Sequence, residues 1–367
     1  MASLYIHIPF CQSKCYFCSF VVSIGKENYV DSYLGALTKE AKSYRRPFVE
    51  TIYIGGGTPS FLSQEQLKHL IRMIRENFQF SAGCELTIEA NPENIDCEKA
   101  KLLYELGVNR ISLGVQSLND KYLKFLGRPH NRQGALEAFS NLRKAGFLNI
   151  NLDLMFSFPG QGLPELEEDV HAIADLGSEH LSLYTLTIEE GSKFYKQNMK
   201  LENDLCQREQ YVRVAQLLEG KGFYQYEVSN FARPGKESRH NRVYWQGGDY
   251  IGLGIGAHSH LNSERFWNTA NLHSYISKVN ENTKPREGHE NLNPEERLME
   301  TLLFGLRMTD GVEILKLEEK FERKLPEEKK NAIDRFIKEG FLAREGTRLK
   351  ATSSGRLVLD ELCSRLI

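Results

Sequence analysis

The sequence predicts an α/β fold in which a partial (β/α)6 barrel is followed by a C-terminal helical, winged-helix-like domain. Three observations support this prediction. Short apolar runs alternate with helix-period segments over the first half of the chain, and polar motifs follow the apolar runs. From about residue 293 onward, helical segments lead into a hairpin-like stretch at 341–352. At 367 residues the chain has room for one large domain and a smaller one.

Six apolar or β-branched runs are the expected strands of the barrel. Strands that alternate with helices at this spacing form a parallel sheet with right-handed crossovers. The six units are therefore expected to build an open or nearly closed barrel. The expected strands are residues 4–8, 50–54, 85–90, 110–114, 149–155 and 180–184.

Five helical segments separate these strands. Ser63 and Asp96 stand just before two of them and precede acidic or amide side chains in the first turn, as N-caps do. Gly107 and Gly146 stand where two of the helical patterns end. The expected helices are residues 27–44, 63–77, 96–106, 132–145 and 163–176.

The chain is expected to divide into three parts. Residues 1–195 should form the barrel, and residues 291–367 the winged-helix-like domain. Between them, residues 196–290 should extend the barrel, because a helical pattern there leads into a loop-rich segment of aromatic residues and glycines.

The composition excludes several classes of protein. Hydrophobic residues make up 41% of the chain and charged residues 26%, which is ordinary for a globular protein. A net charge of −2 gives no global reason to expect nucleic acid as a partner. No apolar run approaches the roughly 20 residues that a membrane span requires, and no secretory signal is recognisable, so we expect a cytoplasmic protein. The odd count of seven cysteines argues against a disulfide framework.

Three of the cysteines, Cys11, Cys15 and Cys18, follow the first expected strand with the spacing C-x-x-x-C-x-x-C. A structural zinc site usually takes four protein ligands, and His7, the nearest further candidate, lies within the buried strand. A redox pair would use Cys15 and Cys18 and leave Cys11 without a role. An iron–sulfur cluster fits best, because a cubane cluster is normally held by four thiolates. Three thiolates would leave one iron open to a second molecule.

Further polar motifs follow the other expected strands. In parallel α/β proteins the chemistry gathers at the carboxyl ends of the strands, where the loops converge. We therefore expect one shared site that includes the cysteines. The motifs are Gly55-Gly56-Gly57-Thr58, Glu89-Ala90-Asn91-Pro92-Glu93, Gln116, Asp153 and Thr185-Leu186-Thr187.

The cysteine spacing and the glycine-rich motif resemble those of the radical S-adenosylmethionine family. In that family the amino and carboxylate groups of S-adenosylmethionine chelate the open iron of a 4Fe–4S cluster. Reduction of the cluster then cleaves a carbon–sulfur bond and yields a 5′-deoxyadenosyl radical. The resemblance implies a radical SAM barrel with a 4Fe–4S cluster on Cys11, Cys15 and Cys18.

A closer resemblance, to the coproporphyrinogen oxidase-like branch of this family, covers nearly the whole chain. It rests on the stretches 5–10, 55–60, 114–117 and 153–155, which read YIHIPF, GGGTPS, GVQS and DLM. Arg128 is suited to a bidentate pair with a carboxylate. The residues that would contact S-adenosylmethionine by this similarity are Tyr5, Phe17, Gly56, Gly57, Thr58, Glu89, Gln116, Arg128 and Asp153.

Two groups within this branch differ next to the cysteines. Oxygen-independent coproporphyrinogen III oxidases carry a fourth cysteine, in C-x-x-x-C-x-x-C-x-C, and a longer N-terminal extension. This chain has Phe20 in place of that cysteine, and only four residues precede Tyr5. The HemW-like haem chaperones have phenylalanine at that position, a short N-terminus and an H-N-x-x-Y-W motif. Residues 240–245 of this chain, HNRVYW, match that motif in full.

The H-N-x-x-Y-W motif suits haem chemistry. Imidazole is a common axial ligand of haem iron, and flat aromatic rings stack on a porphyrin. The alternative is a structural loop whose aromatic residues pack against the barrel mouth. The candidate haem-binding residues are His240, Asn241, Tyr244 and Trp245, and the basic residues expected near the haem propionates are Arg233, Arg239 and Arg242.

The glycine-rich stretch 252–257 is expected to be a strand that closely approaches the same site. It is not read as a dinucleotide fingerprint, because no βαβ unit follows it. His258 and His260 are expected near the barrel mouth, in core or supporting roles and not as metal ligands.

The resemblance implies a haem chaperone that binds haem, a 4Fe–4S cluster and S-adenosylmethionine and delivers haem to acceptor haemoproteins such as respiratory enzymes. No catalytic residue is assigned. Two alternatives stay open: an oxygen-independent coproporphyrinogen III oxidase, and a radical enzyme with an unrelated substrate. Phe20 and the stretch 240–245 favour the chaperone.

Overall fold

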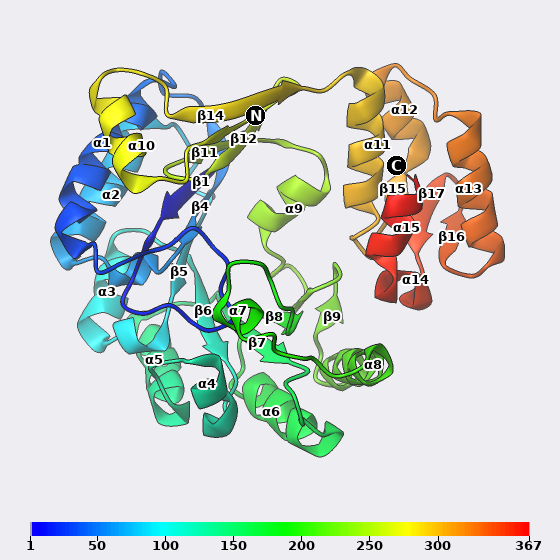
Figure 1. Cartoon of the computed structure of the whole chain (residues 1–367), viewed down its shortest axis with the longest axis horizontal. Coiled ribbons are helices and arrows are strands. Elements are labelled where there is room, and N and C mark those ends of the chain that lie inside the picture. The colour runs from blue at the N-terminus through cyan, green and yellow to red at the C-terminus, as the bar shows by residue number, and fades with distance from the viewer. Residues whose placement is uncertain (1, 367) are drawn as a thin grey trace.

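The computed structural model describes residues 2–366, and its central feature is a 12-stranded mixed sheet (Figure 1). The strand order is β14-β13-β12-β11-β1-β4-β5-β6-β7-β8-β10-β9. Strands β14 and β9 form the two edges, so the sheet curves without closing. This arrangement confirms the predicted α/β fold with a partial barrel.

Six parallel strands form the middle of the sheet and confirm the six that the sequence predicts. Neighbouring strands pair in parallel from β1 through to β8, as short strands joined by crossover helices must. Their bounds are β1 (Ala2–Ile8), β4 (Val49–Gly56), β5 (Glu85–Ala90), β6 (Arg110–Gln116), β7 (Ile150–Phe156) and β8 (His180–Thr185).

Successive side chains of these strands face opposite sides of the sheet. Ile6, Ile54 and Ile88 belong to the main hydrophobic core, which packs against the surrounding helices. The residues one position away lie on the concave side, where the Tyr53 hydroxyl donates to Glu89 over 2.8 Å. The interior of the partial barrel is therefore lined by polar and aromatic side chains.

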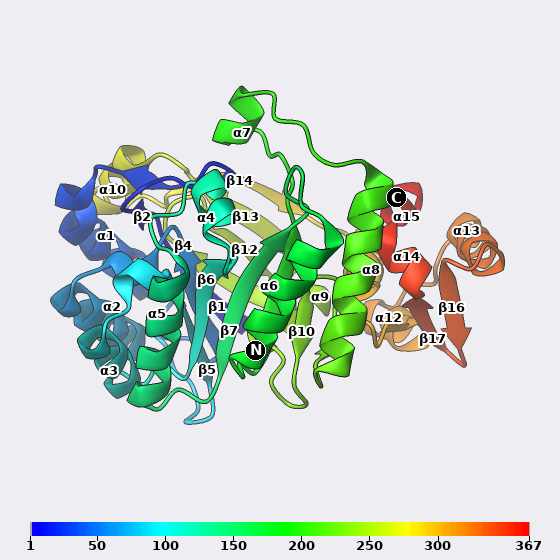
Figure 2. The same cartoon turned by 90° about the horizontal axis from the view of Figure 1, so that it is seen from below.

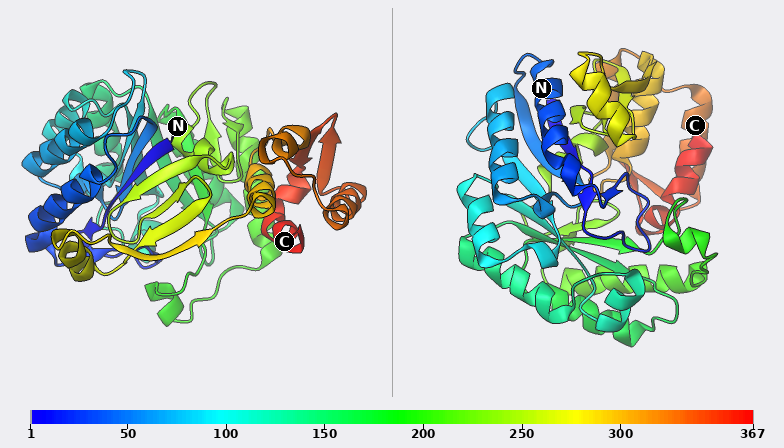
Figure 3. Two further views of the ribbon diagram at one scale, coloured as in Figure 1. Left: turned by 90° about the horizontal axis from the view of Figure 1, so that it is seen from above. Right: turned by 60° about the vertical axis from the view of Figure 1, so that its left-hand side comes forward.

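Helices cover the convex side of the sheet as an outer layer (Figures 2 and 3). The short α4 was not predicted, and η1 precedes α1 in one predicted helix. The bounds are η1 (Glu27–Tyr29), α1 (Val30–Lys42), η2 (Pro59–Phe61), α2 (Gln64–Asn77), η3 (Pro92–Asn94), α3 (Cys97–Glu105), α4 (Asp120–Leu126), α5 (Arg132–Ala145) and α6 (Leu163–Asp175).

The predicted helix signals are confirmed. Ser63 caps α2 in a reciprocal box with Gln66, whose Oε1 accepts from the Ser63 amide over 3.0 Å. Asp96 Oδ1 accepts from the amide of Lys99 over 2.7 Å at the start of α3. Gly146 ends α5 with a φ of +104°, which favours glycine.

Residues 196–290 extend the sheet at both edges. β10 pairs with β8 on one side, and on the other β11 lies parallel to β1 and is followed by antiparallel β12, β13 and β14. Helix α9 lies between these strands and the C-terminal helices (Figure 1). The bounds are α7 (Lys193–Lys196), α8 (Asp204–Gly220), β9 (Tyr224–Gln225), β10 (Asn230–Ala232), α9 (Arg239–Trp245), β11 (Asp249–Leu253), β12 (His258–Leu261), β13 (Glu264–Asn268), α10 (Leu272–Asn280) and β14 (Arg286–Asn291).

The C-terminal segment has its own hydrophobic core, which includes Leu302, Phe336 and Leu349. A three-stranded sheet in the order β15-β17-β16 packs with helices, which gives the predicted winged-helix-like arrangement and its hairpin. The bounds are α11 (Pro294–Gly305), β15 (Val312–Glu313), α12 (Ile314–Phe321), α13 (Glu327–Lys338), β16 (Leu342–Glu345), β17 (Arg348–Ala351), α14 (Ser353–Leu357) and α15 (Leu359–Leu366).

Within residues 2–366, none of the helices combines the length and the hydropathy needed to cross a membrane.

Candidate functional site

The three clustered cysteines lie on the loop that follows β1. Short strands β2 (Phe10–Cys11) and β3 (Ser23–Ile24) pair in parallel and close this loop at its base. The Tyr16 amide donates to the Leu126 carbonyl over 2.9 Å, which ties the middle of the loop to the end of α4. Cys11 is buried, Cys15 and Cys18 are half-buried, and all three are free thiols.

The thiols share a low-polarity environment. Burial raises the pKa of Cys11 to about 11, the Thr58 hydroxyl opposes that shift, and the neighbouring Cys18 and Cys15 raise the pKa further. Burial also raises the pKa of Cys18. Thiols with raised pKa values, such as those of Cys11 and Cys18, ionise readily when a metal centre supplies positive charge.

Among residues 2–366, no set of three or more His, Cys, Asp or Glu side chains converges on one metal ion. A cubane cluster offers a separate iron to each thiolate. The three sulfurs therefore do not have to meet at one point to hold it.

The glycines after β4 approach the cysteine loop closely. A Cβ on Gly57 would lie 2.7 Å from the Pro9 carbonyl oxygen and 2.9 Å from Cys11 Sγ. Gly56 has a φ of +114°, and a Cβ there would lie 2.7 Å from the His7 ring. Only glycine fits at these two positions, so the motif lets the backbone pass beside the cysteines.

Glu89 and Asp153 place two carboxyl groups in the barrel interior. Glu89 accepts from the Tyr53 hydroxyl and, over 3.0 Å, from the Gly56 amide. Burial raises the pKa of Glu89 to about 7 and that of Asp153 to about 6, and Asp153 adds to the shift of Glu89. Arg110 and Arg128 oppose the shift of Asp153 without cancelling it. Two desolvated carboxyls with raised pKa values suit a ligand that carries positive charge.

Arg128 lies directly beside the cysteines. Its Nη1 donates to Cys15 Sγ over 3.2 Å, and its Nη2 donates to Asn91 Oδ1 and to the Gly114 carbonyl over 2.9 and 2.8 Å. Its Nε is buried without a hydrogen-bond partner, which leaves donor capacity for a ligand. Gln116, at the end of β6, adopts a left-handed φ of +69°, which is strained for a residue other than glycine.

The structure brings the other predicted S-adenosylmethionine residues to the same end of the sheet. Thr58 Oγ1 lies 3.3 Å from Cys11 Sγ and accepts from Asn91 Nδ2 over 3.1 Å. Tyr5 donates its hydroxyl to His7 Nδ1 over 3.0 Å, since His7 Nε2 must carry the proton that bonds the Val21 carbonyl. Phe17 packs against a small aromatic cluster around Phe158.

The H-N-x-x-Y-W motif forms α9 and lies at the opposite end of the barrel. The backbone amides of Arg239 and His240 donate to the Glu85 carboxylate over 3.1 and 3.0 Å, and Glu85 is the first residue of β5. The alternative interpretation, a structural loop whose aromatic residues pack against the barrel mouth, is therefore wrong about the position of the motif. Helix α9 instead caps the amino ends of the strands.

His240 is buried, and both of its ring nitrogens have partners. Thr51 donates its only hydroxyl proton to Ser3 over 2.7 Å, so His240 Nδ1 must donate to Thr51 over 2.8 Å. Nε2 then accepts from the Tyr244 hydroxyl over 2.9 Å. Burial, aided by Arg110, lowers the pKa of His240 to about 3. In this arrangement His240 has no free nitrogen for iron, which contradicts its candidacy as an axial ligand.

The last two motif residues, Tyr244 and Trp245, line a pocket of about 460 Å³. Aromatic side chains dominate its wall, and two histidines that the sequence placed elsewhere face it, His258 and His260. The sequence signal for them is the alternation His-Ser-His, which puts both imidazoles on one face of a strand. The predicted placement at the barrel mouth is wrong for His260, because β12 runs antiparallel and carries that residue back opposite Tyr250.

The remaining motif residues and basic side chains lie outside this pocket. Asn241 sits on the first turn of α9, where its amide donates to the capping Ser238 hydroxyl over 3.3 Å. Arg239 donates to the Gly83 carbonyl, and Arg233 donates to the Ser178 carbonyl. Arg242 lies 3.9 Å from Asp310. The pocket-lining residues include none of the three arginines predicted to meet propionates.

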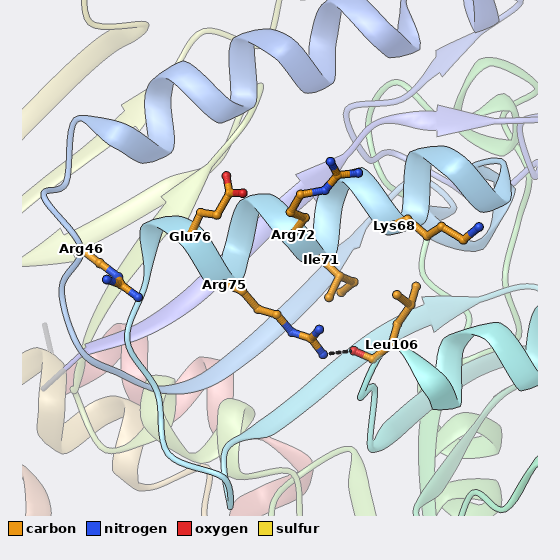
Figure 4. Close-up of a pocket in the computed structure, with 7 residues that line it drawn as sticks. All are labelled: Arg46, Lys68, Ile71, Arg72, Arg75, Glu76 and Leu106. Atoms are coloured by element: carbon orange, nitrogen blue, oxygen red, sulfur yellow. Dashed lines mark hydrogen bonds between the residues drawn. The ribbon is translucent and has the colours of Figure 1, made fainter.

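A further hollow of about 370 Å³ lies on the outer helical layer (Figure 4). It is lined chiefly by basic side chains of α2, and Arg75 donates to the Leu106 carbonyl across it over 2.7 Å. It includes none of the predicted site residues.

Comparison with known proteins agrees with this geometry. Residues 5–173 match the model of the Radical SAM superfamily, and residues 292–358 match that of the HemN C-terminal domain. The chain is 38% identical to the heme chaperone HemW of Bacillus subtilis (strain 168), over 99% of this chain and 98% of that protein. It is 35% identical to heme chaperone HemW of Lactococcus lactis subsp. lactis, over 96% and 94% of the two chains.

Among solved structures, coproporphyrinogen III oxidase (HemN) from Escherichia coli, a radical SAM enzyme, superposes with a TM-score of 0.87. The match covers 100% of this chain and 89% of that one at 24% sequence identity. At that identity the likeness establishes the fold and leaves the activity open.

Proposed function

Because the chain belongs to the family of the heme chaperone HemW, within the radical SAM superfamily, we propose that it binds haem and delivers it to acceptor haemoproteins. Membership of the superfamily implies a 4Fe–4S cluster and S-adenosylmethionine as cofactors. The observation that carries the haem assignment is the aromatic pocket that Tyr244 and Trp245 line. Flat rings around a pocket with imidazoles are what a porphyrin requires.

The residues at the carboxyl ends of the strands fit the two implied cofactors. Cys11, Cys15 and Cys18 would hold the cluster, and the glycine motif leaves room for a ligand beside it. When bound, the cluster supplies an electron and S-adenosylmethionine supplies a cleavable carbon–sulfur bond.

The residues proposed for S-adenosylmethionine act on different parts of that molecule. Glu89 and Asp153 offer negative charge to its cationic groups, and Arg128 has a free donor for its carboxylate. The full proposed set is Tyr5, Phe17, Gly56, Gly57, Thr58, Glu89, Gln116, Arg128 and Asp153.

The cellular setting is also proposed. Seven free thiols suit a reducing compartment such as the cytoplasm. Haem-requiring respiratory enzymes are the acceptors that the family resemblance favours. We further propose that residues 1–195 hold the cluster, that 196–290 supply most of the haem pocket, and that 291–367 close it.

Two assays on the same anaerobically reconstituted protein test this function. Titration with haem should produce a saturable Soret band at one haem per chain. Incubation with coproporphyrinogen III, S-adenosylmethionine and a reductant should yield no protoporphyrinogen IX. Sustained decarboxylation without haem binding would contradict the chaperone function and support the oxidase instead.

A further inference from the structure

We propose that haem binds in the pocket between β12 and α11, with His258 and not His240 as the axial ligand of its iron. This inference rests on the proposed haem-chaperone function and adds the site at which the cargo is held. Four observations support it: the side chains on one face of β11–β13, the aromatic rings of α9 and α11 opposite that face, the unpaired nitrogens of the two histidines, and the charged groups around Arg265.

One face of the sheet extension gathers the polar and aromatic side chains. The cross-strand pairs are Tyr250 with His260, His260 with Arg265, and His258 with Trp267. Directly paired residues share a face, so these five side chains form one continuous surface. Ser259, between the two histidines, points the other way.

The central side chains on the other face of β12 and β13 are buried and contact the rest of the protein. Ser259 is buried, and its hydroxyl accepts from the Gly252 amide over 2.9 Å. Phe266, the neighbour of Trp267, is likewise buried. The histidine-bearing face is therefore the one left for a ligand.

Helices α9 and α11 supply the opposite wall. Tyr244 packs edge-on against Tyr250, with ring centroids 4.7 Å apart, and Trp245 packs edge-on against Phe304 at 6.4 Å. These rings and the sheet face enclose the pocket of about 460 Å³, within the range of small-molecule sites. Aromatic surfaces on two sides suit a flat, apolar macrocycle.

The two imidazoles have ring nitrogens that are not engaged in hydrogen bonds with the described part of the protein. Within residues 2–366 the ring of His258 has no hydrogen bond, is exposed, and stacks on Trp267 with centroids 5.7 Å apart and planes at 21°. His260 is only 4% exposed, yet its Nε2 is buried without a partner. The indole Nε1 of Trp245 is also buried without a partner. Buried polar atoms without partners are rare in folded proteins, so these two mark the pocket as one that the protein alone leaves incomplete.

Only one of the two histidines can ligate a given haem. Residues two apart in a strand are separated by about 7 Å and point to the same side. That separation is too short for their rings to reach the iron from opposite faces of a porphyrin. Because His258 is exposed and therefore accessible to haem, we assign it as the iron ligand. His260 is buried farther along the same strand.

The charges orient the bound haem. Arg265 donates to Glu290 over 2.5 Å and also to Glu300 of α11. Two carboxylates and one guanidinium leave this part of the pocket no excess positive charge. The propionates are therefore expected on the solvent side, with the ring face and the iron in contact with the protein.

Haem titration of full-length variants, followed by absorption and electron paramagnetic resonance, tests the assignment. His258→Ala should weaken haem affinity at least tenfold, and His258→Met should retain haem with a changed Soret position and spin state. Such a ligand-dependent spectrum does not follow from a merely structural role. His240→Ala should keep the wild-type spectrum when bound.

The matched control is His289→Ala. His289 is exposed on β14 and pairs with Phe266, so it belongs to the opposite face of the same sheet. The His289→Ala variant should bind haem as the wild type does. A wild-type spectrum in both His258 variants would overturn the ligand assignment while leaving the chaperone function intact. A wild-type protein that takes up no haem would instead contradict the proposed function.

Discussion

At the scale of single residues, the most consequential feature of the barrel interior is the raised pKa of Glu89, about 7, and of Asp153, about 6. Burial is the main cause for both. A carboxyl with a raised folded pKa holds its proton to higher pH in the folded than in the unfolded protein. The ligand-free protein should therefore lose stability as pH rises from about 4.5 to about 7.

Replacing Glu89 by Gln should reduce this pH dependence and leave the part due to Asp153, because the amide preserves the shape and does not ionise. In the wild type, affinity for S-adenosylmethionine should tighten by up to about tenfold per pH unit across the same window, as carboxylates form to meet its positive charge. Calorimetric titration between pH 5.5 and 7.5 measures this dependence. A pH-independent affinity in the wild type would remove Glu89 and Asp153 from the proposed site.

The glycine motif allows a steric test. Gly57→Ala would set a Cβ against the Pro9 carbonyl and Cys11 Sγ at distances that real contacts do not reach. The variant should reconstitute with less iron than the roughly four per chain expected of a cubane cluster. Gly83→Ala is the control, because no atom lies within 4 Å of its added Cβ. Equal iron content in the two variants would show that the close approach at Gly57 is not needed.

At the scale of elements, α9 covers the amino ends of the strands, and both ring nitrogens of its His240 are hydrogen-bonded. His240→Ala would leave the Tyr244 hydroxyl without its acceptor, at a cost of about 1–3 kcal/mol, while Thr51 would keep only its hydrogen bond to Ser3. Urea denaturation should show a clear loss of stability. The half-buried His171 of α6 provides a control, whose change to Ala should cost far less. Unchanged stability in His240→Ala would show that the hydrogen bonds of His240 do not help to hold α9 against the strands.

The contrast between the strands and α9 shows what the sequence could predict. The six parallel strands followed from local alternation and from helix signals such as Ser63 and Asp96, which act within one turn. The cysteine site followed too, because parallel strands bring their carboxyl ends together. The position of α9 did not follow, since it depends on the distant Glu85 and Thr51. The alternation His-Ser-His puts His258 and His260 on one face of a strand, but the cross-strand pairing that brings His258 to the proposed haem pocket has no local signal.

At the scale of the whole molecule, the proposed cofactor site and the proposed haem pocket lie at different ends of the barrel, and a column of aromatic rings runs between them. Tyr244 meets His240 edge-on, His240 stacks on Tyr53 at 5.2 Å, and Tyr53 stacks on Tyr5 at 6.3 Å. Tyr5 then bonds His7, whose Nε2 contacts the Val21 carbonyl beyond the cysteines. The column is a physical contact path between the two sites.

This separation predicts that loss of the cluster leaves the haem pocket intact. Cys11→Ala, Cys15→Ala and Cys18→Ala should each lose the broad cluster absorption yet bind haem with the wild-type Soret band. Cys97→Ala, an exposed cysteine on α3, should retain both. Loss of haem binding in all three cluster variants would show that cluster and haem share one site.

The central claim is that this radical SAM scaffold carries haem. It is tested most directly by mixing the haem-loaded, cluster-containing protein with an excess of an apo-haemoprotein and following the Soret bands of donor and acceptor. The account predicts that the donor band declines as the acceptor band grows, faster than with free haem at the same concentration. A donor that keeps its haem, or an acceptor that fills no faster than from free haem, would contradict it.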